Sequence, residues 1–559
     1  MSALTIEVAA AIEVAGGTAA VLASTTVPGG GTFVAPAVDW LAVLPVGAVL
    51  AAAVLGVLVE AFVPRSARRY VQLAVAAIGL LVALAGVLLL WNDDAIRQVL
   101  SSPVDPETSG MVLDRAALFL QGTLVALTAL ALLVIGERGS GSLDPFAAQP
   151  ATSPGSSEEA AAERAGFTST EVFPLTMFAL GGMMIFASAA DLLTMFVALE
   201  VLSLPLYIMS GLARRRRLLS QEASLKYFLL GAFSSALFLY GIALIYGLTG
   251  TVNLYGIFAA LDRPSEGFDW TGQIPLLVVA VFLLVVGLLF KVGAVPFHAW
   301  TPDVYTGAPT PVTGFMAACT KVAAFGALLR VLYVPLRPVM EVLEPALWAV
   351  AAVTMVLGSL VAIKQTDMKR MLAYSSIAHA GFILTGLVTV QNAGVVGVLF
   401  YVLAYGVSTI AAFGIVTLVR ESDADGAVGG EATHLSQWAG LGKRSPLLAG
   451  AFAFLLLAFA GIPLTSGFVA KVAVFSAAVD GGVAWLAVIG VLASAAAAFF
   501  YLRVIVLMYF TEPSTERPVV VHGGWLTGTA VTLGVLATLA LGVFPQPFLD
   551  LAGAVTAAR

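Results

Sequence analysis

The sequence predicts an all-α polytopic membrane protein with about fourteen transmembrane helices. Of its 559 residues, 60% are hydrophobic and 11% are charged, whereas charged residues make up ~25% of a soluble domain. Apolar stretches of ~20 residues, the length that crosses a bilayer as a helix, follow one another along most of the chain. The mean hydropathy of +0.99 also indicates that the bulk of the chain lies in the membrane.

Composition also excludes several classes of function. The net charge of −6 gives no support for nucleic-acid binding. One cysteine, Cys319, permits no disulfide within the chain and no cysteine-ligated iron–sulfur cluster. With four histidines besides it, no metal site suggests itself, and neither a dinucleotide fingerprint nor a phosphate loop is present. We therefore expect no metal and no redox cofactor in this chain.

The apolar runs place the spans, beginning after an N-terminal extension, 1–40. This extension is not expected to be a signal peptide, because the first basic residue of the chain is Arg65 and the extension itself contains Glu7 and Glu13. The predicted spans are 41–63, 70–91, 111–136, 171–189, 192–213, 221–249, 274–297, 308–334, 340–364, 371–391, 394–419, 446–479, 483–510 and 523–548.

Two of these helices are expected to be discontinuous, the seventh and the twelfth. The segment 446–479 is too long for one straight span, and an interruption at 461–466 explains the excess. The seventh span runs into Pro296 and Pro302, past which a helix cannot continue. The two breaks lie five spans apart, and this odd offset gives the two units opposite orientations in the membrane.

This placement predicts two inverted five-helix repeats. The first repeat covers 171–335 (helices 4–8) and the second covers 336–512 (helices 9–13). Three helices, 41–136, precede them, followed by a loop, 137–170, whose Ser, Pro, Glu and Ala content indicates flexibility. The last helix and a tail occupy 513–559.

The distribution of Lys and Arg among the loops predicts the orientation of the chain in the membrane. Lys and Arg cluster after odd-numbered spans, as at Arg214–Arg217 and at Lys364, Lys369 and Arg370, while loops after even spans are neutral or acidic. One exception is the loop after span eight, with Arg330 and Arg337. By the positive-inside rule the odd loops are cytoplasmic, so both termini are extracytoplasmic and the chain is a multi-pass protein of the plasma membrane.

Four ionisable residues stand alone in long apolar stretches: Glu200, Lys291, Lys321 and Lys471. A charge at the bilayer centre costs at least ~2.5–3.5 kcal/mol, so each of them needs a partner, a hydrated cavity or a moving ion. Burial disfavours the charged form of a lysine and a neighbouring carboxylate favours it. Glu200 beside Lys291 would therefore form a pair whose proton affinity depends on its geometry.

Weaker candidates surround these four residues. His298 lies by the first break, and His379 lies in span ten with Ser375 and Ser376; both histidines could relay protons or simply pack. Glu222 and Lys226 open span six beside a basic run, where surface pairing is the default reading. The membrane tyrosines, among them Tyr401 and Tyr405, need a role only if a water path uses them.

Several motifs together resemble the antiporter-like subunits of respiratory complex I. These are the run from Phe290-Lys-Val-Gly-Ala-Val-Pro to Thr-Gly-Ala-Pro-Thr-Pro311, together with Leu199-Glu-Val-Leu-Ser-Leu-Pro205, Glu222-Ala-Ser-Leu-Lys-Tyr-Phe228, Leu372-Ala-Tyr-Ser-Ser-Ile-Ala-His-Ala-Gly-Phe382 and Gly461-Ile-Pro-Leu-Thr-Ser-Gly-Phe-Val-Ala-Lys471. The resemblance covers roughly 40–510. The segment Trp300-Thr-Pro-Asp-Val-Tyr305 resembles the subunit N branch of this family, and so does the presence of Lys rather than Glu at 471.

The resemblance implies roles for these residues. Glu200 and Lys291 would be the paired residues of helices five and seven, Lys321 the central lysine of helix eight and Lys471 the far lysine of helix twelve. His298 and His379 would lie on the proton path. FMN, iron–sulfur clusters and quinone would be held by partner subunits, and the partners would be the other membrane subunits and the lipid bilayer.

Three functions compete on these observations. The first is a proton-translocating subunit of NADH–quinone oxidoreductase, an enzyme whose redox centres lie outside this chain. The second is a subunit of a cation/proton antiporter of the Mrp type with the same fold. The third is a membrane scaffold with inert ion pairs.

Overall fold

The computed structural model describes most of the chain. The described residues are 25–26, 32–33, 37–92, 97–98, 100–101, 109–137, 144–149, 152–153, 156–165, 167–262, 270–422, 428–512, 519–521 and 524–557. Most of the predicted extension, 1–40, therefore lies outside the described residues. The parts of it that are described form the short strands β1 (Thr25–Thr26), β2 (Thr32–Phe33) and β3 (Ala37–Val38).

A helix lies over every predicted span. The helices are α2 (Trp40–Phe62), α3 (Arg65–Trp91), α4 (Arg115–Gly136), α6 (Val172–Ser188), α7 (Leu192–Ser210), α8 (Arg217–Thr249), α10 (Trp270–Val292), α12 (Thr310–Tyr333), α13 (Met340–Ile363), α14 (Met368–Leu387), α15 (Asn392–Leu418), α17 (Pro446–Ala460) with α18 (Ser466–Asp480), α19 (Ala484–Phe510) and α20 (Trp525–Val543). Among the described residues, 11 spans are long and apolar enough to cross a membrane, and α6 and α17 are shorter apolar helices. The all-α polytopic membrane fold is thus confirmed.

Aspartates mark where several of these helices begin. The carboxylates of Asp39, Asp114, Asp191 and Asp367 accept backbone N–H groups in the first turns of α2, α4, α7 and α14. Such capping satisfies amides that have no partner within the helix and places a negative charge at the positive end of the helix dipole. These aspartates therefore fix where the four helices start, which the hydropathy pattern alone locates only to within a few residues.

The two five-helix repeats use the same packing pairs. In the first repeat α6 packs against α7 and α12, and α8 packs against α10. In the second, α13 packs against α14 and α19, and α15 packs against α18. The repeats meet where α12 lies against α15, and where the short helix α11 (Trp300–Gly307) lies against α14. Both predicted breaks are present, between α10 and α11 and between α17 and α18.

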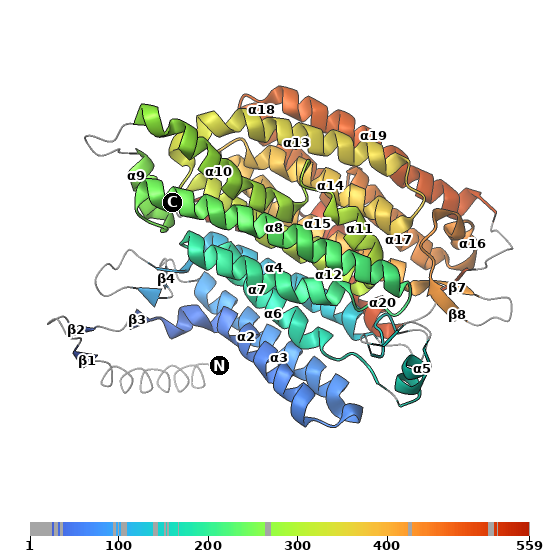
Figure 1. Cartoon of the computed structure of the whole chain (residues 1–559). Coiled ribbons are helices and arrows are strands. Elements are labelled where there is room, and N and C mark those ends of the chain that lie inside the picture. Colours follow the sequence, from blue (N-terminus) through green and yellow to red (C-terminus); the bar gives the residue numbers. More distant parts are fainter. Residues whose placement is uncertain are drawn as a thin grey trace.

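Figure 1 shows the helices side by side in one body, with α2 and α3 along one long edge and α18 and α19 along the opposite edge. Small elements lie at the ends of the bundle. They are α5 (Ser157–Arg164), α9 (Leu254–Asp262), α16 (Leu441–Arg444), α21 (Gln546–Ala557), and the 3-10 turns η3 (Arg337–Val339) and η4 (Leu435–Trp438).

The strands are short and tie loops together. β3 pairs with β5 (Leu100–Ser101), and β4 (Arg97–Gln98) pairs with β6 (Val112–Leu113). At the opposite end β7 (Val419–Ser422) pairs antiparallel with both β8 (Val428–Glu431) and β9 (Val519–Val521). This three-stranded sheet, which the hydropathy pattern did not predict, joins two loops that are far apart in the sequence.

Part of the loop 137–170, whose composition predicts flexibility, lies within the described residues. Where it is described, Phe146 is buried and bridges to Ala213, and α5 is held by an ion pair of 3.1 Å between Glu159 and Arg217. The described parts of this loop are therefore packed against the loop that follows α7.

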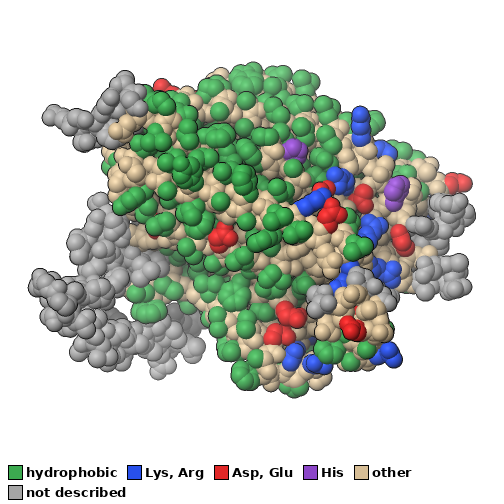
Figure 2. Space-filling model, viewed as in Figure 1, with side chains coloured by type: hydrophobic (Ala, Val, Ile, Leu, Met, Phe, Trp, Pro, Cys, Tyr) green, Lys and Arg blue, Asp and Glu red, His purple; other side chains and the backbone are tan. Residues whose placement is uncertain are grey.

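The surface agrees with a membrane location. Figure 2 shows hydrophobic side chains covering the middle of the visible face, while Lys, Arg, Asp and Glu gather toward the end that carries β7, β8 and α16. Large apolar side chains such as Phe62, Phe233 and Phe510 are 81%, 66% and 82% exposed. Exposed apolar area of this extent requires hydrocarbon around it.

Candidate functional site: buried lysines at two helix breaks

The first break begins with a glycine that ends α10. Gly293 has φ +79, the left-handed region, and its N–H donates to the carbonyls of Leu289 and Phe290 at 3.0 Å each. Ala294 N donates back to Leu289 O at 3.0 Å. This glycine-ended motif satisfies the earlier carbonyls of the last turn and leaves that of Val292 free for an outside donor.

The second break repeats this backbone geometry. Gly461 has φ +83, and its N–H donates to Leu457 O and Ala458 O at 3.0 Å each, with Ile462 N on Leu457 O at 3.1 Å. Gly293 and Gly461 are therefore equivalent positions, as are Val292 and Ala460 before them. When the two half-helices are aligned at these glycines, their last carbonyls have the same hydrogen-bond pattern, which agrees with an internal repeat.

Lys291 lies two residues before Gly293 at the first break and is 3% exposed. Its ammonium donates to Ser203 Oγ on α7 at 2.7 Å. The ring centroids of Tyr227 and Tyr207 lie 5.4 and 5.8 Å from Nζ, which places the cation over two aromatic faces. A hydroxyl and two rings thus replace the water that the ammonium loses on burial.

Glu200 lies one turn before Ser203 on the same helix, and its carboxylate interacts electrostatically with Lys291. No ion pair within 4.0 Å joins the two among the described residues, and Oε1 of Glu200 is buried without a hydrogen-bond partner there. The structure therefore brings the predicted pair within electrostatic reach, but the ammonium of Lys291 donates to Ser203 rather than to Glu200.

Lys321 occupies the centre of α12 and is 2% exposed. Its ammonium donates to Val292 O at 2.7 Å, the carbonyl left free by the first break. The partial negative charge at the C-terminal end of α10 thus faces the ammonium. Lys321 is therefore held by a backbone group that no substitution can remove.

Lys471 meets the equivalent carbonyl in the second repeat. Located one turn into α18, it donates to Phe459 O and Ala460 O at 2.9 Å each and to Ser494 Oγ of α19 at 2.6 Å. Ser494 itself donates to Ala460 O at 3.2 Å. By this contact Ser494 holds in the second repeat the place that Lys321 holds in the first.

His379 lies between the two groups of lysines. Its ring nitrogens contact two tyrosine hydroxyls, Nδ1 with Tyr401 at 2.8 Å and Nε2 with Tyr501 at 3.3 Å. Tyr501 in turn bonds Ser375, and the imidazole is close enough to interact electrostatically with both Lys321 and Lys471. The histidine therefore joins a buried chain of groups that can each accept and donate a proton.

The remaining candidates lie apart from this chain. His298 is in the turn between α10 and α11, and its Nδ1 has no hydrogen-bond partner among the described residues. Lys226 pairs at 2.6 Å with Glu222 and at 2.8 Å with Asp303, in a cluster that is 31–55% exposed. Glu222 and Lys226 are thus a surface pair, as the default reading has it.

Sequence reasoning did not single out Ser203, Tyr501 or Ser494. Small hydroxyls are common in membrane helices, and their contacts depend on how neighbouring helices are rotated. Among the described residues no three His, Cys, Asp or Glu side chains are grouped to hold a metal. The arrangement can therefore bind and pass protons, with a hydroxyl acceptor for Lys291 and backbone carbonyl acceptors for Lys321 and Lys471.

Comparison with known proteins defines the class. Residues 189–497, more than half of the chain, match the family described as NADH:quinone oxidoreductase/Mrp antiporter, TM. The chain therefore belongs to the family of antiporter-like membrane subunits. The matched region contains both breaks and all the buried lysines of the site.

Closer relatives define the branch. "NADH-quinone oxidoreductase subunit N" of Salinispora arenicola is 55% identical over 92% of this chain and 97% of its own length, and that of Beutenbergia cavernae is 57% identical over 94% and 99%. The chain thus belongs to the subunit N family, as its motifs predicted. It is a membrane protein of that family.

Solved structures agree in fold. A chain of respiratory complex I from Thermus thermophilus matches with a TM-score of 0.70 and 33% identity, covering 91% of this chain and all of its own. A chain of the Mrp complex from Dietzia matches with a TM-score of 0.74 but 24% identity, over 92% and 97%. The second likeness concerns the fold alone, so the Mrp-type alternative is the weaker one.

Proposed function

We propose that this chain translocates protons as the subunit N of a bacterial NADH–quinone oxidoreductase. The observation that carries this proposal is the row of ionisable groups in the membrane domain: Lys291, Lys321, His379 and Lys471, which are buried, and Glu200, whose Oε1 atom is buried. A buried charge of this kind costs several kcal/mol unless it has a function or a partner. Membership in the subunit N family supports the assignment of that function to electron-transfer-coupled pumping.

The proton is passed along this row in response to redox chemistry in partner subunits. When Glu200 approaches Lys291, the ammonium form is favoured; when it withdraws, the lysine releases its proton toward Lys321. His379 and its tyrosines then connect Lys321 with Lys471. FMN, the iron–sulfur clusters and quinone belong to the partner subunits, and neighbouring antiporter-like subunits flank this chain in the membrane.

The basic loops orient the chain. The end of the bundle that carries Arg214–Arg217, Lys369 and the β7–β8–β9 sheet faces the cytoplasm, and both termini are extracytoplasmic. In this orientation a proton moved outward works against about 2.3 kcal/mol per 100 mV of membrane potential.

The test is purification of the complex through a tag on this chain, followed by reconstitution in vesicles. NADH–quinone activity should copurify, with proton uptake that depends on it. Lys291→Met should abolish proton translocation in a fully assembled complex. Sodium-dependent proton flux without copurifying flavin would instead support the antiporter, and full pumping by the variant would support an inert scaffold.

A further inference from the structure

We propose that the polar cavity beside Lys369 is the cytoplasmic inlet of the proton path, with Lys369 as its first proton relay. The inference rests on the proposed function and assigns a residue and an opening to it. The juxtaposition that carries it is a buried lysine at the wall of a charged cavity, on the same helix face as Ser376 and His379.

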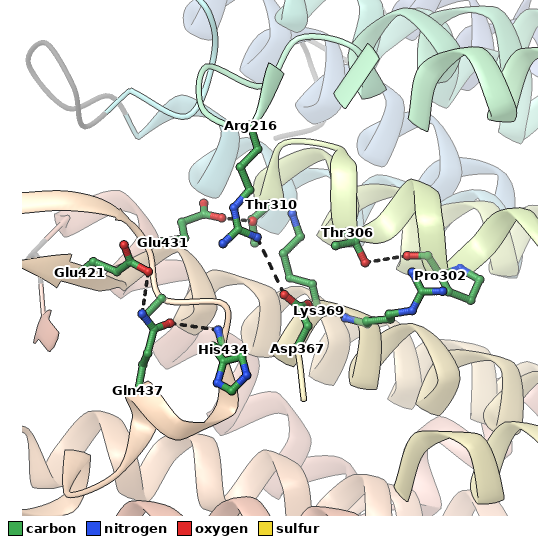
Figure 3. Close-up of polar contacts among 12 residues, drawn as sticks. Arg216, Pro302, Thr306, Thr310, Asp367, Lys369, Glu421, Glu431, His434 and Gln437 are labelled. Atoms are coloured by element: carbon green, nitrogen blue, oxygen red, sulfur yellow. Dashed lines mark hydrogen bonds and ion pairs between the residues drawn. The ribbon is translucent and has the colours of Figure 1, made fainter. Parts of the chain in front are cut away.

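The cavity lies where the two repeats meet at the basic end of the bundle. Its volume is about 380 Å³, and it is lined by residues from the loops after α4 and α7, by the α11–α12 connection, by the start of α14 and by the loop between β7 and η4. A space of this size holds several water molecules. Figure 3 shows Lys369 reaching from its helix toward Thr310, with Glu431 and Arg216 on the near side.

The lining carries both signs of charge, already largely engaged. Arg216 pairs with Asp367 at 3.9 Å, Thr310 donates to Glu431, and Glu421 accepts from Gln437 at 2.6 Å. Figure 3 shows these contacts around the rim. Because opposite charges balance one another, the cavity suits water and protons better than it suits an anion or a metal cation.

Lys369 differs from the rim residues because it is buried, with 3% exposure. Its ammonium donates to Ala308 O at 2.7 Å, and it interacts electrostatically with Glu431 and Asp367. A lysine held by one neutral carbonyl is a better proton donor and acceptor than one locked in a close ion pair. Its ammonium can therefore exchange protons with water in the cavity.

The helix face leads from this lysine inward. Ser376 follows Lys369 by seven residues and His379 by ten, so all three lie on one face of α14 and span about 15 Å. Ser376 also contacts the Tyr305 hydroxyl at 3.5 Å. The stretch between Lys369 and Ser376 is short enough for one or two bridging waters, after which the path joins the His379 chain described above.

A structural reading competes with this one. Ala308 is the C-terminal cap of α11, and a lysine that donates to such a carbonyl stabilises the helix end without moving protons. Arginine separates the two readings. Lys369→Arg keeps the charge and the donor, but a guanidinium cannot release its proton in the working range of a pump.

The first experiment uses the reconstituted complex and measures protons translocated per electron. Lys369→Met and Lys369→Arg should each lower proton translocation at least about tenfold, the order of effect expected from loss of a proton-transfer group. The matched control is Lys364→Met, which removes an exposed lysine from the loop between α13 and α14, five residues before Lys369. Wild-type pumping by Lys369→Arg would overturn the proposal and leave Lys369 as a helix cap.

In a second experiment the complex is assembled before the cavity is blocked, so that a loss of pumping on labelling cannot result from misfolding. Thr306 lines the cavity and is partly exposed, and Cys319 is buried. In a Cys319→Ala background, a Thr306→Cys complex is assembled first and then treated from the cytoplasmic side with a trimethylammonium methanethiosulfonate. Labelling should block proton uptake, whereas labelling of a matched Lys364→Cys complex should not. Labelled but fully active Thr306→Cys complexes would refute the inlet.

The two proposals fail separately. If the Lys291→Met complex pumps normally, the proposed function is wrong, and there is no proton path that the cavity could supply. If Lys291→Met is inactive while the Lys369 and Thr306 variants pump normally, the function stands and the inlet lies elsewhere.

Discussion

The two helix breaks have the same backbone and different lysines. Gly293 and Gly461 end their helices with identical hydrogen-bond patterns. In the first break a lysine precedes the glycine and a second lysine, from α12, binds the free carbonyl; in the second, one lysine follows the glycine and binds that carbonyl together with Ser494. The difference teaches that the carbonyl is the constant element and that the repeats place cations around it in different numbers.

This arrangement gives the first repeat two buried lysines at its break and the second repeat one. Lys291 is held by a side chain, Ser203, and can exchange partners when Glu200 moves. Lys321 and Lys471 are held by backbone carbonyls, which do not move without the helix. We therefore regard Lys291 as the adjustable member of the row and the other two as fixed stations.

The largest effect is expected from making the first break like the second. Lys321→Ser supplies the hydroxyl found at Ser494 but no ammonium, so proton translocation should fall at least about tenfold, as ~1.4 kcal/mol added to a barrier would produce. Proton uptake per electron in vesicles is the measurement, with exposed Lys443→Ser as the control. A variant that still pumps would show that proton translocation needs no lysine on the Val292 carbonyl of the first break.

Alanine at the two glycines should separate backbone strain from lysine placement. Both substitutions force a left-handed residue, at a cost of ~1–2 kcal/mol. A Cβ at Gly461 would lie 2.9 Å from Lys471 Cδ, whereas one at Gly293 would meet Thr301 Oγ1 at 2.9 Å. Both variants should lose similar thermal stability, but Gly461→Ala should lose more pumping. Equal loss of pumping would mean that strain, not lysine displacement, is responsible.

A smaller effect is expected from the partner of the adjustable lysine. Ser203→Ala removes a hydrogen bond to a charged group, which is worth ~1.5–3 kcal/mol. Because Glu200 remains to receive the ammonium, pumping should be reduced several-fold but not lost. Ser210→Ala is a matched control, since Ser210 is equally buried on α7 and donates to Leu206 O. A similar loss in both variants would indicate a packing effect.

The smallest effect is expected at Ser494. Ser494→Ala removes one donor from Ala460 O and one of the three acceptors of Lys471, whose ammonium keeps the carbonyls of Phe459 and Ala460 at 2.9 Å each. Because these two backbone acceptors remain, pumping should change about twofold or less. A loss as large as that of Lys321→Ser would show that Ser494 is itself a proton carrier.

Much of the fold could be predicted because a membrane helix is recognisable from its length and its apolar composition. The hydrocarbon thickness fixes the length of each span, and Gly293 with Pro296, and Gly461 with Pro463, mark both breaks in the sequence. Lone charges in apolar runs likewise identified Glu200, Lys291, Lys321 and Lys471, because burial makes each of them costly.

The partners of those charges could not be predicted. Whether Lys291 meets Glu200 or Ser203 depends on the rotation of α7 against α10, and the two residues share one face of α7. Strands β7, β8 and β9 are three or four residues long, and β9 pairs with β7 across a large sequence separation, so hydropathy does not reveal the sheet. Lys369 looks like a loop lysine in the sequence and is buried because four loops converge over it.

The strand β9 also sets the order in which the protein can be completed during biosynthesis. Its partner β7 leaves the ribosome before α17, α18 and α19, and at ~5–20 residues per second several seconds pass before β9 follows. Until then the sheet beside the cavity at Lys369 has an unpaired edge at β7. The sheet is therefore completed late, after the helices that carry Lys291, Lys321 and Lys471 have all been synthesised.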